Sequence, residues 1–196
     1  MSEDTQHVVA MGASAGGLAA IRDLIAVLPD DLEAPVVIGA HSSEGSILLE
    51  AVRSARPSKI KRAEDGEVLR PGWIYVIPPA RHGFFRNGAL HLSDVVRDSG
   101  YRPSIDALFM TLAAEYGRRA IAVVLSGMMK DGMRCAQVIY DMGGRTIVQD
   151  PDEAAQSDML SSVIRNDHPR AIREASELGE WLLAQIGRDP EEHPVS

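Results

Sequence analysis

Residues 7–17 read HVVAMGASAGG, and this stretch predicts the fold. Its first five residues form a short apolar run that stops at Gly12, as a fully buried parallel strand does. Beyond the glycines, apolar residues recur at spacings of three and four, which gives one helical face that Pro29 ends. These residues are Leu18, Ile21, Leu24, Ile25 and Leu28. The stretch therefore predicts a strand, a tight turn and an amphipathic helix.

The same alternation of strand and helix continues along the chain. Further strands are expected at residues 35–40, 59–62, 73–77, 120–125 and 145–149. The expected helices are one with Ile47, Leu48, Ala51 and Val52 on its inner face, one at residues 103–116, one at 131–142, one beginning at Asp150, and a last one with Leu178, Leu182, Leu183 and Ile186. Most of the chain thus consists of βαβ units.

Local signals refine this reading at three places. Pro103 suits the first turn of its helix, because a proline there forfeits no intrahelical hydrogen bond. The series Asp150, Pro151 and Glu153 matches an N-cap, a first-turn proline and a capping-box partner. Asn87 and Gly88, between residues 84–86 and 89–92, suit a type I′ hairpin turn. The expected fold is α/β, a doubly wound, mostly parallel Rossmann-like sheet with flanking helices and a small antiparallel hairpin excursion.

Composition narrows the class of protein. The length of 196 residues suits one sizeable core, so we expect a single domain over residues 1–187 and a flexible tail over 188–196. The net charge of −8 disfavours nucleic acid as a partner. No apolar run is long enough to insert into a membrane, and the acidic start does not resemble a secretory signal, so we expect a cytoplasmic protein.

Metal and cofactor sites are not expected. The six histidines show no spacing that would place a pair on one metal ion. Cys135 is the single cysteine and cannot form an internal disulfide. It is interpreted as a buried apolar residue, with a reactive thiol as the alternative.

In a doubly wound sheet ligands bind beyond the carboxyl ends of the strands, and the first such loop contains GxSxG. This motif places the Ser14 hydroxyl on a sharp turn before a helix N-terminus, whose N–H groups suit a developing oxyanion. The alternative is a phosphate-cradling loop or a plain tight turn. The dinucleotide fingerprint would need glycine at position 14, and the P-loop lysine is absent.

A serine nucleophile needs an imidazole and a carboxylate at the same edge of the sheet. His41 directly follows the second expected strand, and Asp131 lies in the loop after the strand at residues 120–125. Taken singly, His41 could be a solvated loop residue and Asp131 a helix N-cap. Because all three residues fall at one edge, we predict a triad of Ser14, His41 and Asp131.

These residues lie within a longer pattern that resembles the catalytic domain of CheB, the chemoreceptor methylesterase. The likeness runs through GASxGG, PVVIGAH, EDGEVLRPGWIYVIPP, RPSIDALF, LSGMMKDG and IVQDPDEA. It implies that Ser14, His41 and Asp131 are nucleophile, base and acid, and that N–H groups near Ala15 and Met128 hold the oxyanion. It also implies hydrolysis of glutamate γ-methyl esters, with deamidation of glutamine in many members, on a methylated chemoreceptor or another receptor-like protein.

Several positions depart from the family pattern. Ala40 and Ser42 flank His41 in place of the usual residues, and Met129 stands where glycine is usual, so its side chain would narrow the pocket or force a different turn. Arg102 is a candidate substrate contact that could pair with acidic receptor residues, or it forms a surface ion pair. The family usually carries an N-terminal phosphoryl-receiving domain, whereas this sequence starts just before its first expected strand. We therefore expect different regulation, with a separate regulatory protein as one route.

Two alternatives to the hydrolase remain. The first is an interaction module that keeps the fold while Met129 and the altered His41 loop block turnover. The second is a nucleotide-binding domain that uses GASAGG for phosphate.

Overall fold

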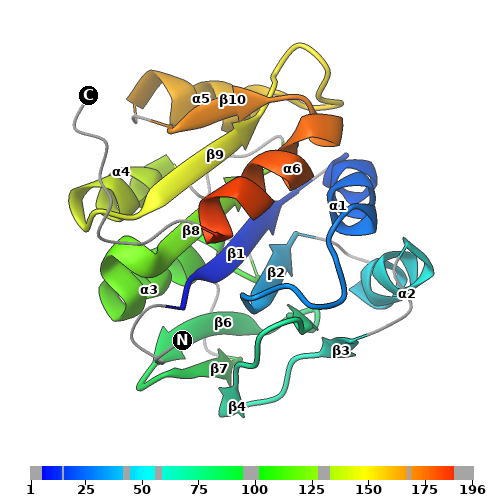
Figure 1. Cartoon of the computed structure of the whole chain (residues 1–196), viewed down its shortest axis with the longest axis vertical. Coiled ribbons are helices and arrows are strands. Elements are labelled where there is room, and N and C mark those ends of the chain that lie inside the picture. Colours follow the sequence, from blue (N-terminus) through cyan, green and yellow to red (C-terminus); the bar gives the residue numbers. More distant parts are fainter. Residues whose placement is uncertain are drawn as a thin grey trace.

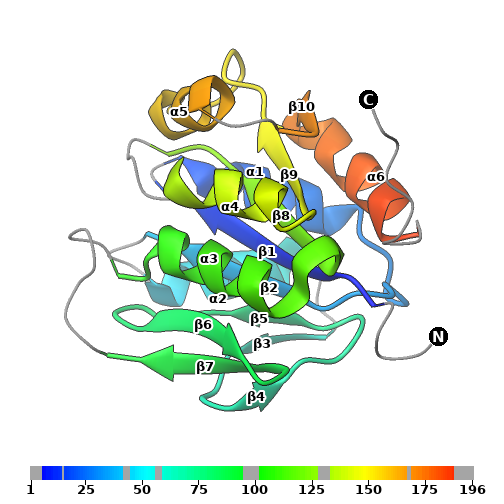
Figure 2. The same cartoon turned by 90° about the vertical axis from the view of Figure 1, so that its left-hand side faces the viewer.

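A computed structural model describes the architecture of the chain (Figures 1 and 2). It describes residues 6–14, 16–41, 45–55, 59–94, 102–127, 133–166 and 169–187, and of these the side chains of all but residues 45–47, 133–136 and 166. The strands are β1 Val8–Ala13, β2 Val36–Ala40, β3 Ile60–Arg62, β4 Glu67–Val68, β5 Ile74–Val76, β6 His82–Arg86, β7 Ala89–Ser93, β8 Ala120–Val124, β9 Arg145–Gln149 and β10 Ala171–Arg173. The helices are α1 Gly17–Ala26, α2 Gly45–Ala55, α3 Ile105–Tyr116, the 3₁₀ turn η2 Gly117–Arg119, α4 Met133–Asp141, α5 Asp158–Asn166 and α6 Ala175–Ile186.

Seven strands form one sheet in the order β10-β9-β8-β1-β2-β5-β3, and each pair of neighbours runs parallel. The chain passes from β1 to β2 on one side, whereas β8 lies on the other side of β1, so the order of the strands reverses at β1. In open α/β sheets the crevice at such a topological switch point is where ligands bind. The expected doubly wound parallel sheet is therefore confirmed, and its switch point lies at the carboxyl end of β1.

Helices cover both faces of the large sheet. Figure 1 shows α1, α2 and α6 over one face, and Figure 2 shows α3, α4 and α5 over the other. Because successive side chains of a strand point to opposite faces, β1 supplies both hydrophobic cores: Val9 and Met11 pack under α1 and α6, and Val8 and Ala10 pack under α3. This two-sided burial explains why the strands read as continuous apolar runs.

A second, antiparallel sheet has the order β4-β7-β6. Its hairpin between β6 and β7 turns at Asn87 and Gly88, whose φ angles are 52° and 72°. Positive φ at both central residues is what a type I′ turn requires, so the expected hairpin is confirmed. The excursion is larger than expected, because Glu67 and Val68, which lie between the strands expected at residues 59–62 and 73–77, add a third strand.

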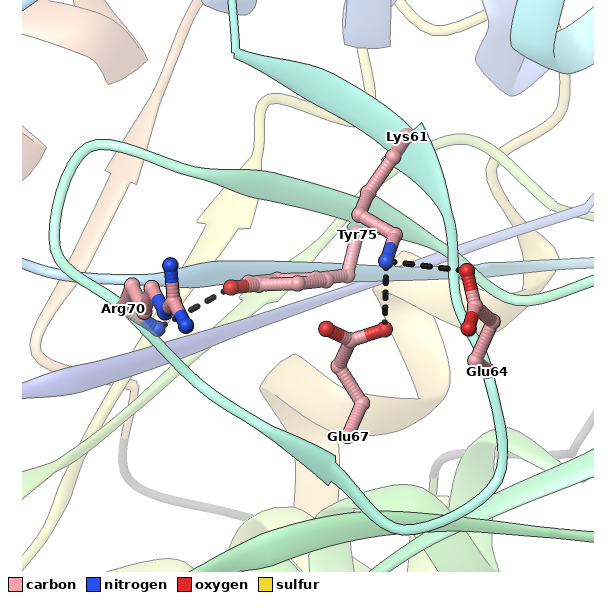
Figure 3. A network of polar contacts seen from close by, with 5 residues as sticks. All are labelled: Lys61, Glu64, Glu67, Arg70 and Tyr75. Atoms are coloured by element: carbon pink, nitrogen blue, oxygen red, sulfur yellow. Dashed lines mark hydrogen bonds and ion pairs between the residues drawn. The ribbon is translucent and has the colours of Figure 1, made fainter.

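A polar cluster ties this small sheet to the large one (Figure 3). The ammonium of Lys61 on β3 lies 2.8 Å from Glu67 Oε2 on β4 and 3.0 Å from Glu64 Oε1. Hydrogen bonds to Glu67 and then Glu64 raise the pKa of Lys61 above its ordinary value. Beside them the buried phenol of Tyr75 accepts a hydrogen bond of 3.0 Å from the Arg70 N–H, and burial raises its pKa. Since the two ion pairs of Lys61 are partly exposed, we expect each to contribute only modestly to stability.

Two predicted helix starts are wrong in position. The helix expected to begin at Asp150 begins at Asp158 instead. The Asp150 carboxylate accepts from the Asp152 N–H at 2.9 Å within a turn. The Asp150 N–H, which a capping box would pair with Glu153, donates to the Arg173 carbonyl at 2.7 Å, and Glu153 accepts from the N–H of Ala175. Ala175, which is distant in sequence, thus binds the Glu153 carboxylate that a capping box at Asp150 would need.

The α3 start and the first apolar stripe also need correction. Pro103 precedes the helix, because the hydroxyl of Ser104 accepts from the Ala107 N–H at 3.2 Å and makes Ser104 the N-cap. Leu18, expected in the buried stripe, is exposed. In the first turn of α1 it is Gly17, not Leu18, that packs against the end of β1, where an added Cβ would lie 2.7 Å from Ala13 Cβ. The expected start of the helix at residues 131–142 falls outside the described residues.

Candidate active site

The Ser14 side chain lies on the turn between β1 and α1. Ser14 directly follows the strand and is buried. Its N–H donates to the carbonyl of Ser126 at 2.9 Å, and its own carbonyl accepts from the Gly17 N–H at 3.0 Å. Gly16 has a φ of 81°, a conformation that favours glycine. The peptide bonds on both sides of Ser14 are thus fixed, with the positive end of the α1 macrodipole behind the hydroxyl.

The His41 imidazole is positioned by the pairing of β1 with β2. Ala13 and Ala40 face each other across this parallel pair, so the next residues, Ser14 and His41, emerge side by side at the carboxyl edge. The His41 N–H donates to the carbonyl of Ala13 at 2.9 Å, which extends the ladder by one bond. Strand register therefore brings the two side chains together.

The two side chains are within hydrogen-bonding distance. His41 Nδ1 lies 3.3 Å from Ser14 Oγ. To take the hydroxyl proton, Nδ1 must carry no hydrogen, which places the ring proton on Nε2. A separation of this length suits a nucleophile and base without substrate, where such hydrogen bonds are commonly long.

The end of β8 packs tightly against Ser14 on the side away from β2. A Cβ atom added to Gly127 would lie 2.9 Å from Ser14 Cβ and 2.9 Å from Met159 Cε. Only a residue without a side chain allows this approach. The turn at Ser126 and Gly127 therefore forms one wall of the site and leads into the segment that contains Met128.

Arg102 lies beside the carboxyl end of β2. Its Nη1 donates to the carbonyl of Ala80 at 3.2 Å, and the nearby Ser104 N–H donates to His82 Nδ1 at 3.2 Å. The intervening Pro103 approaches Gly39 on β2, with its Cγ 3.9 Å from where a Cβ would stand. These contacts anchor the Arg102 segment next to β2, the strand that His41 directly follows.

Four residues expected in the site lie outside the described residues: Ala15, Met128, Met129 and Asp131. Their expected roles remain predictions. The side chain of Cys135 is likewise outside the described part of the structure.

Gln149 is a residue near the site that sequence reasoning missed. It ends β9 and is buried, and its Oε1 accepts from the Ser126 N–H at 2.9 Å. Its Nε2 donates to Glu153 Oε1 at 3.0 Å. A polar side chain that ends a buried strand at the ligand-binding edge is the signal that could have identified it.

The fold and the site together define the class of protein. It is a doubly wound α/β protein with a hydroxyl and an imidazole paired at the switch point of its sheet, an arrangement that serine hydrolases use. The family of CheB methylesterases matches residues 9–182, and the chain belongs to this family.

Individual relatives agree with this assignment. The chain is 34% identical over 180 residues to protein-glutamate methylesterase/protein-glutamine glutaminase 2 of Anaeromyxobacter dehalogenans. The matched region covers 86% of this chain and 53% of that protein. It is 36% identical over 162 residues to methylesterase/glutaminase 4 of Myxococcus xanthus, covering 80% of this chain and 45% of the relative. The chain spans about half the length of these curated relatives.

A solved structure matches the whole architecture. The crystal structure of the Thermotoga maritima CheB methylesterase catalytic domain superposes with a TM-score of 0.86 at 29% sequence identity. The match covers 92% of this chain and 98% of that one. Among the helices that the structure describes, none combines the length and the apolar character needed to cross a bilayer.

Proposed function

We propose that this chain is a cytoplasmic serine hydrolase that cleaves glutamate γ-methyl esters on a methylated receptor-like protein. In this proposal Ser14 is the nucleophile, His41 the general base and Asp131 the carboxylate that orients His41. The observation that carries it is the distance of 3.3 Å between Ser14 Oγ and His41 Nδ1, at the switch point of a chain that belongs to the CheB methylesterase family. Residues 1–187 would act as one catalytic domain.

The proposed reaction is acyl transfer in two steps. Ser14 Oγ attacks the ester carbonyl carbon while His41 takes the hydroxyl proton. The oxyanion is held by N–H groups near Ala15 and Met128, and the positive end of α1 favours the same charge. When the tetrahedral intermediate collapses, the proton passes from His41 to the departing methoxide and methanol leaves.

A water molecule then completes the cycle. His41 takes a proton from the water, whose oxygen attacks the acyl group on Ser14. Collapse returns the proton to Ser14 and releases a free glutamate side chain. Asp131 stays ionised throughout and holds the ring proton of His41 on the far nitrogen. With a glutamine side chain in place of the ester, the same steps would release ammonia.

The proposed substrate follows from the relatives, which are named for both methylesterase and glutaminase activity. A methylated chemoreceptor presents its esters on a helix that also carries acidic residues. The Arg102 guanidinium, anchored to the carbonyl of Ala80, is proposed to pair with such an acidic residue, with Met129 as a second contact. Control of the activity by a separate regulatory protein is part of the proposal.

Labelling with a fluorophosphonate tests the nucleophile, because the reagent reacts only with an activated hydroxyl. We expect labelling of the wild-type chain and its loss in both Ser14→Ala and His41→Ala. Methanol release from methylated receptors of the source cell should disappear in the same two variants. Asp131→Asn should slow both reactions by about four orders of magnitude, as in other triads.

Ser54→Ala is the matched control, because Ser54 is an exposed serine of α2 whose hydroxyl donates to the Ala51 carbonyl. It should label and turn over like the wild type. Labelling that survives Ser14→Ala would contradict the assigned nucleophile. An unlabelled wild-type chain that still binds methylated receptors would instead support an interaction module.

A further inference from the structure

A line of hydrogen bonds runs from the N-terminus of α6 to the backbone of Ser14. From this line we infer that Gln149 and Glu153 are positioning residues for the nucleophile. The inference rests on the proposed function of Ser14. It deepens that proposal by adding two residues that touch neither the substrate nor the reacting atoms.

The centre of the line is the carboxamide of Gln149, whose oxygen and nitrogen both form hydrogen bonds. Its Oε1 accepts from the Ser126 N–H at 2.9 Å, and its Nε2 donates to Glu153 Oε1 at 3.0 Å. The carbonyl of Ser126 in turn accepts from the Ser14 N–H at 2.9 Å. One peptide unit therefore separates the Gln149 bond from the bond that fixes the nucleophile.

The far end of the line is held by a helix. Glu153 Oε1 also accepts from the N–H of Ala175, the first residue of α6. The N-cap residue Glu174 makes no side-chain capping bond, so Glu153 supplies an acceptor to this helix from another loop. A carboxylate at a helix N-terminus is stabilised by the macrodipole, which gives the line a rigid anchor.

A second set of bonds holds the same turn from the adjacent loop. The hydroxyl of Ser126 accepts from the Gln156 N–H at 3.0 Å and donates to the Gln156 carbonyl at 3.2 Å. That carbonyl also accepts from the Gly127 N–H at 3.0 Å. The loop between β9 and α5 thus binds the turn at Ser126 and Gly127 on two sides, and a Cβ added to Gly127 would lie 2.9 Å from Ser14 Cβ.

This arrangement matters for catalysis because the turn carries the chain from β8 toward Met128 and Asp131. Catalytic groups must be held to within about 0.5 Å, and a displacement of about 1 Å can cost roughly a hundredfold in rate. Removing the Gln149 carboxamide leaves the buried Ser126 N–H without that acceptor, so the turn shifts to find another. Ser14 moves with it, since its N–H is bonded to the same residue.

The test compares Gln149→Leu with Glu153→Gln and Glu153→Leu. For Gln149→Leu we expect the second-order rate of fluorophosphonate labelling to fall by about ten- to a hundredfold, with kcat falling in parallel and KM within about twofold. Glu153→Gln keeps an oxygen acceptor for Gln149 and Ala175, so it should label within about twofold of wild type. The labelling rate of Glu153→Leu should lie between those of the other two variants. If Gln149→Leu does not fold, Glu153→Leu replaces it in the test.

A purely structural role would give a different pattern. Ile121→Val is the matched control, because Ile121 is fully buried on β8 near the opposite edge of the sheet. It should lower thermal stability and leave the labelling rate unchanged. Labelling of Gln149→Leu at the wild-type rate, under conditions where it is fully folded, would overturn the inference.

Amide hydrogen exchange makes the test independent of the proposed function. In Gln149→Leu the amides of Ser126 and Ser14 should exchange at least about tenfold faster than in the wild type, while that of Leu125 stays protected. If the wild-type chain is not labelled at all, the proposed function fails and hydrogen exchange alone decides the positioning role. Unchanged exchange at both serines would then overturn it.

Discussion

The close contact between the glycine-rich turn and the loop after β9 can be tested by Gly16→Ala. Gly16 has a φ of 81°, and an added Cβ would lie 2.7 Å from Ala155 Cβ and 3.0 Å from Ser126 Oγ. The left-handed conformation costs an alanine about 1 kcal/mol. Forcing a methyl group into a filled space adds about 1–3 kcal/mol. We therefore expect Gly16→Ala to lower the free energy of unfolding by about 3 kcal/mol.

The matched control is Gly88→Ala, which has the same backbone cost without the contact. Gly88 has a φ of 72°, and nothing lies within 4 Å of its added Cβ. The free energy of unfolding of Gly88→Ala should be lower than that of the wild type by only about 1 kcal/mol. For a chain of this size 1 kcal/mol corresponds to about 2–4 °C in Tm, so Gly16→Ala should melt roughly 6–12 °C lower and Gly88→Ala roughly 2–4 °C lower.

The measurement is urea and thermal unfolding followed by circular dichroism, with Gly66→Ala as a second open control at a φ of 74°. The reasoning is refuted if Gly16→Ala loses no more stability than the two open positions. That result would mean that Ala155 does not press on the turn that carries Ser14. A large loss at all three positions would instead assign the whole effect to the backbone conformation.

Two further predictions concern α3. Burial raises the pKa of Tyr116 to about 12, so the folded chain keeps a phenol proton that the unfolded chain loses near pH 10; unfolding therefore becomes easier as pH rises from about 10 to 12. Across that range the free energy of unfolding of the wild type, measured by urea titration, should fall by up to about 3 kcal/mol relative to that of Tyr116→Phe. A difference between the two proteins that does not change with pH would contradict this. Ser104→Ala should lower the free energy of unfolding by about 1 kcal/mol because the Ala107 N–H loses its capping hydroxyl; a variant as stable as the wild type in urea titrations would show that the cap contributes nothing.

Much of the fold could be read from local pattern. Buried parallel strands are apolar on both faces, so residues such as Val8 to Met11 stand out as continuous runs whatever their neighbours are. The turn at Asn87 and Gly88 was equally readable, because few residues adopt positive φ. The nearness of Ser14 and His41 followed as well, since both come directly after strands that pair in parallel.

What the sequence by itself determined, then, is the succession of strands and helices, the hairpin turn and the side chains placed at the carboxyl edge. The tertiary structure alone decided that β8 lies against β1, that Glu153 caps α6 instead of its own segment, and that Gln149 reaches Ser126. The physical reason is the range of the forces. Backbone conformation and periodic burial are encoded within a few neighbouring residues. A hydrogen bond between segments more than 20 residues apart exists only after the packed cores have brought those segments together.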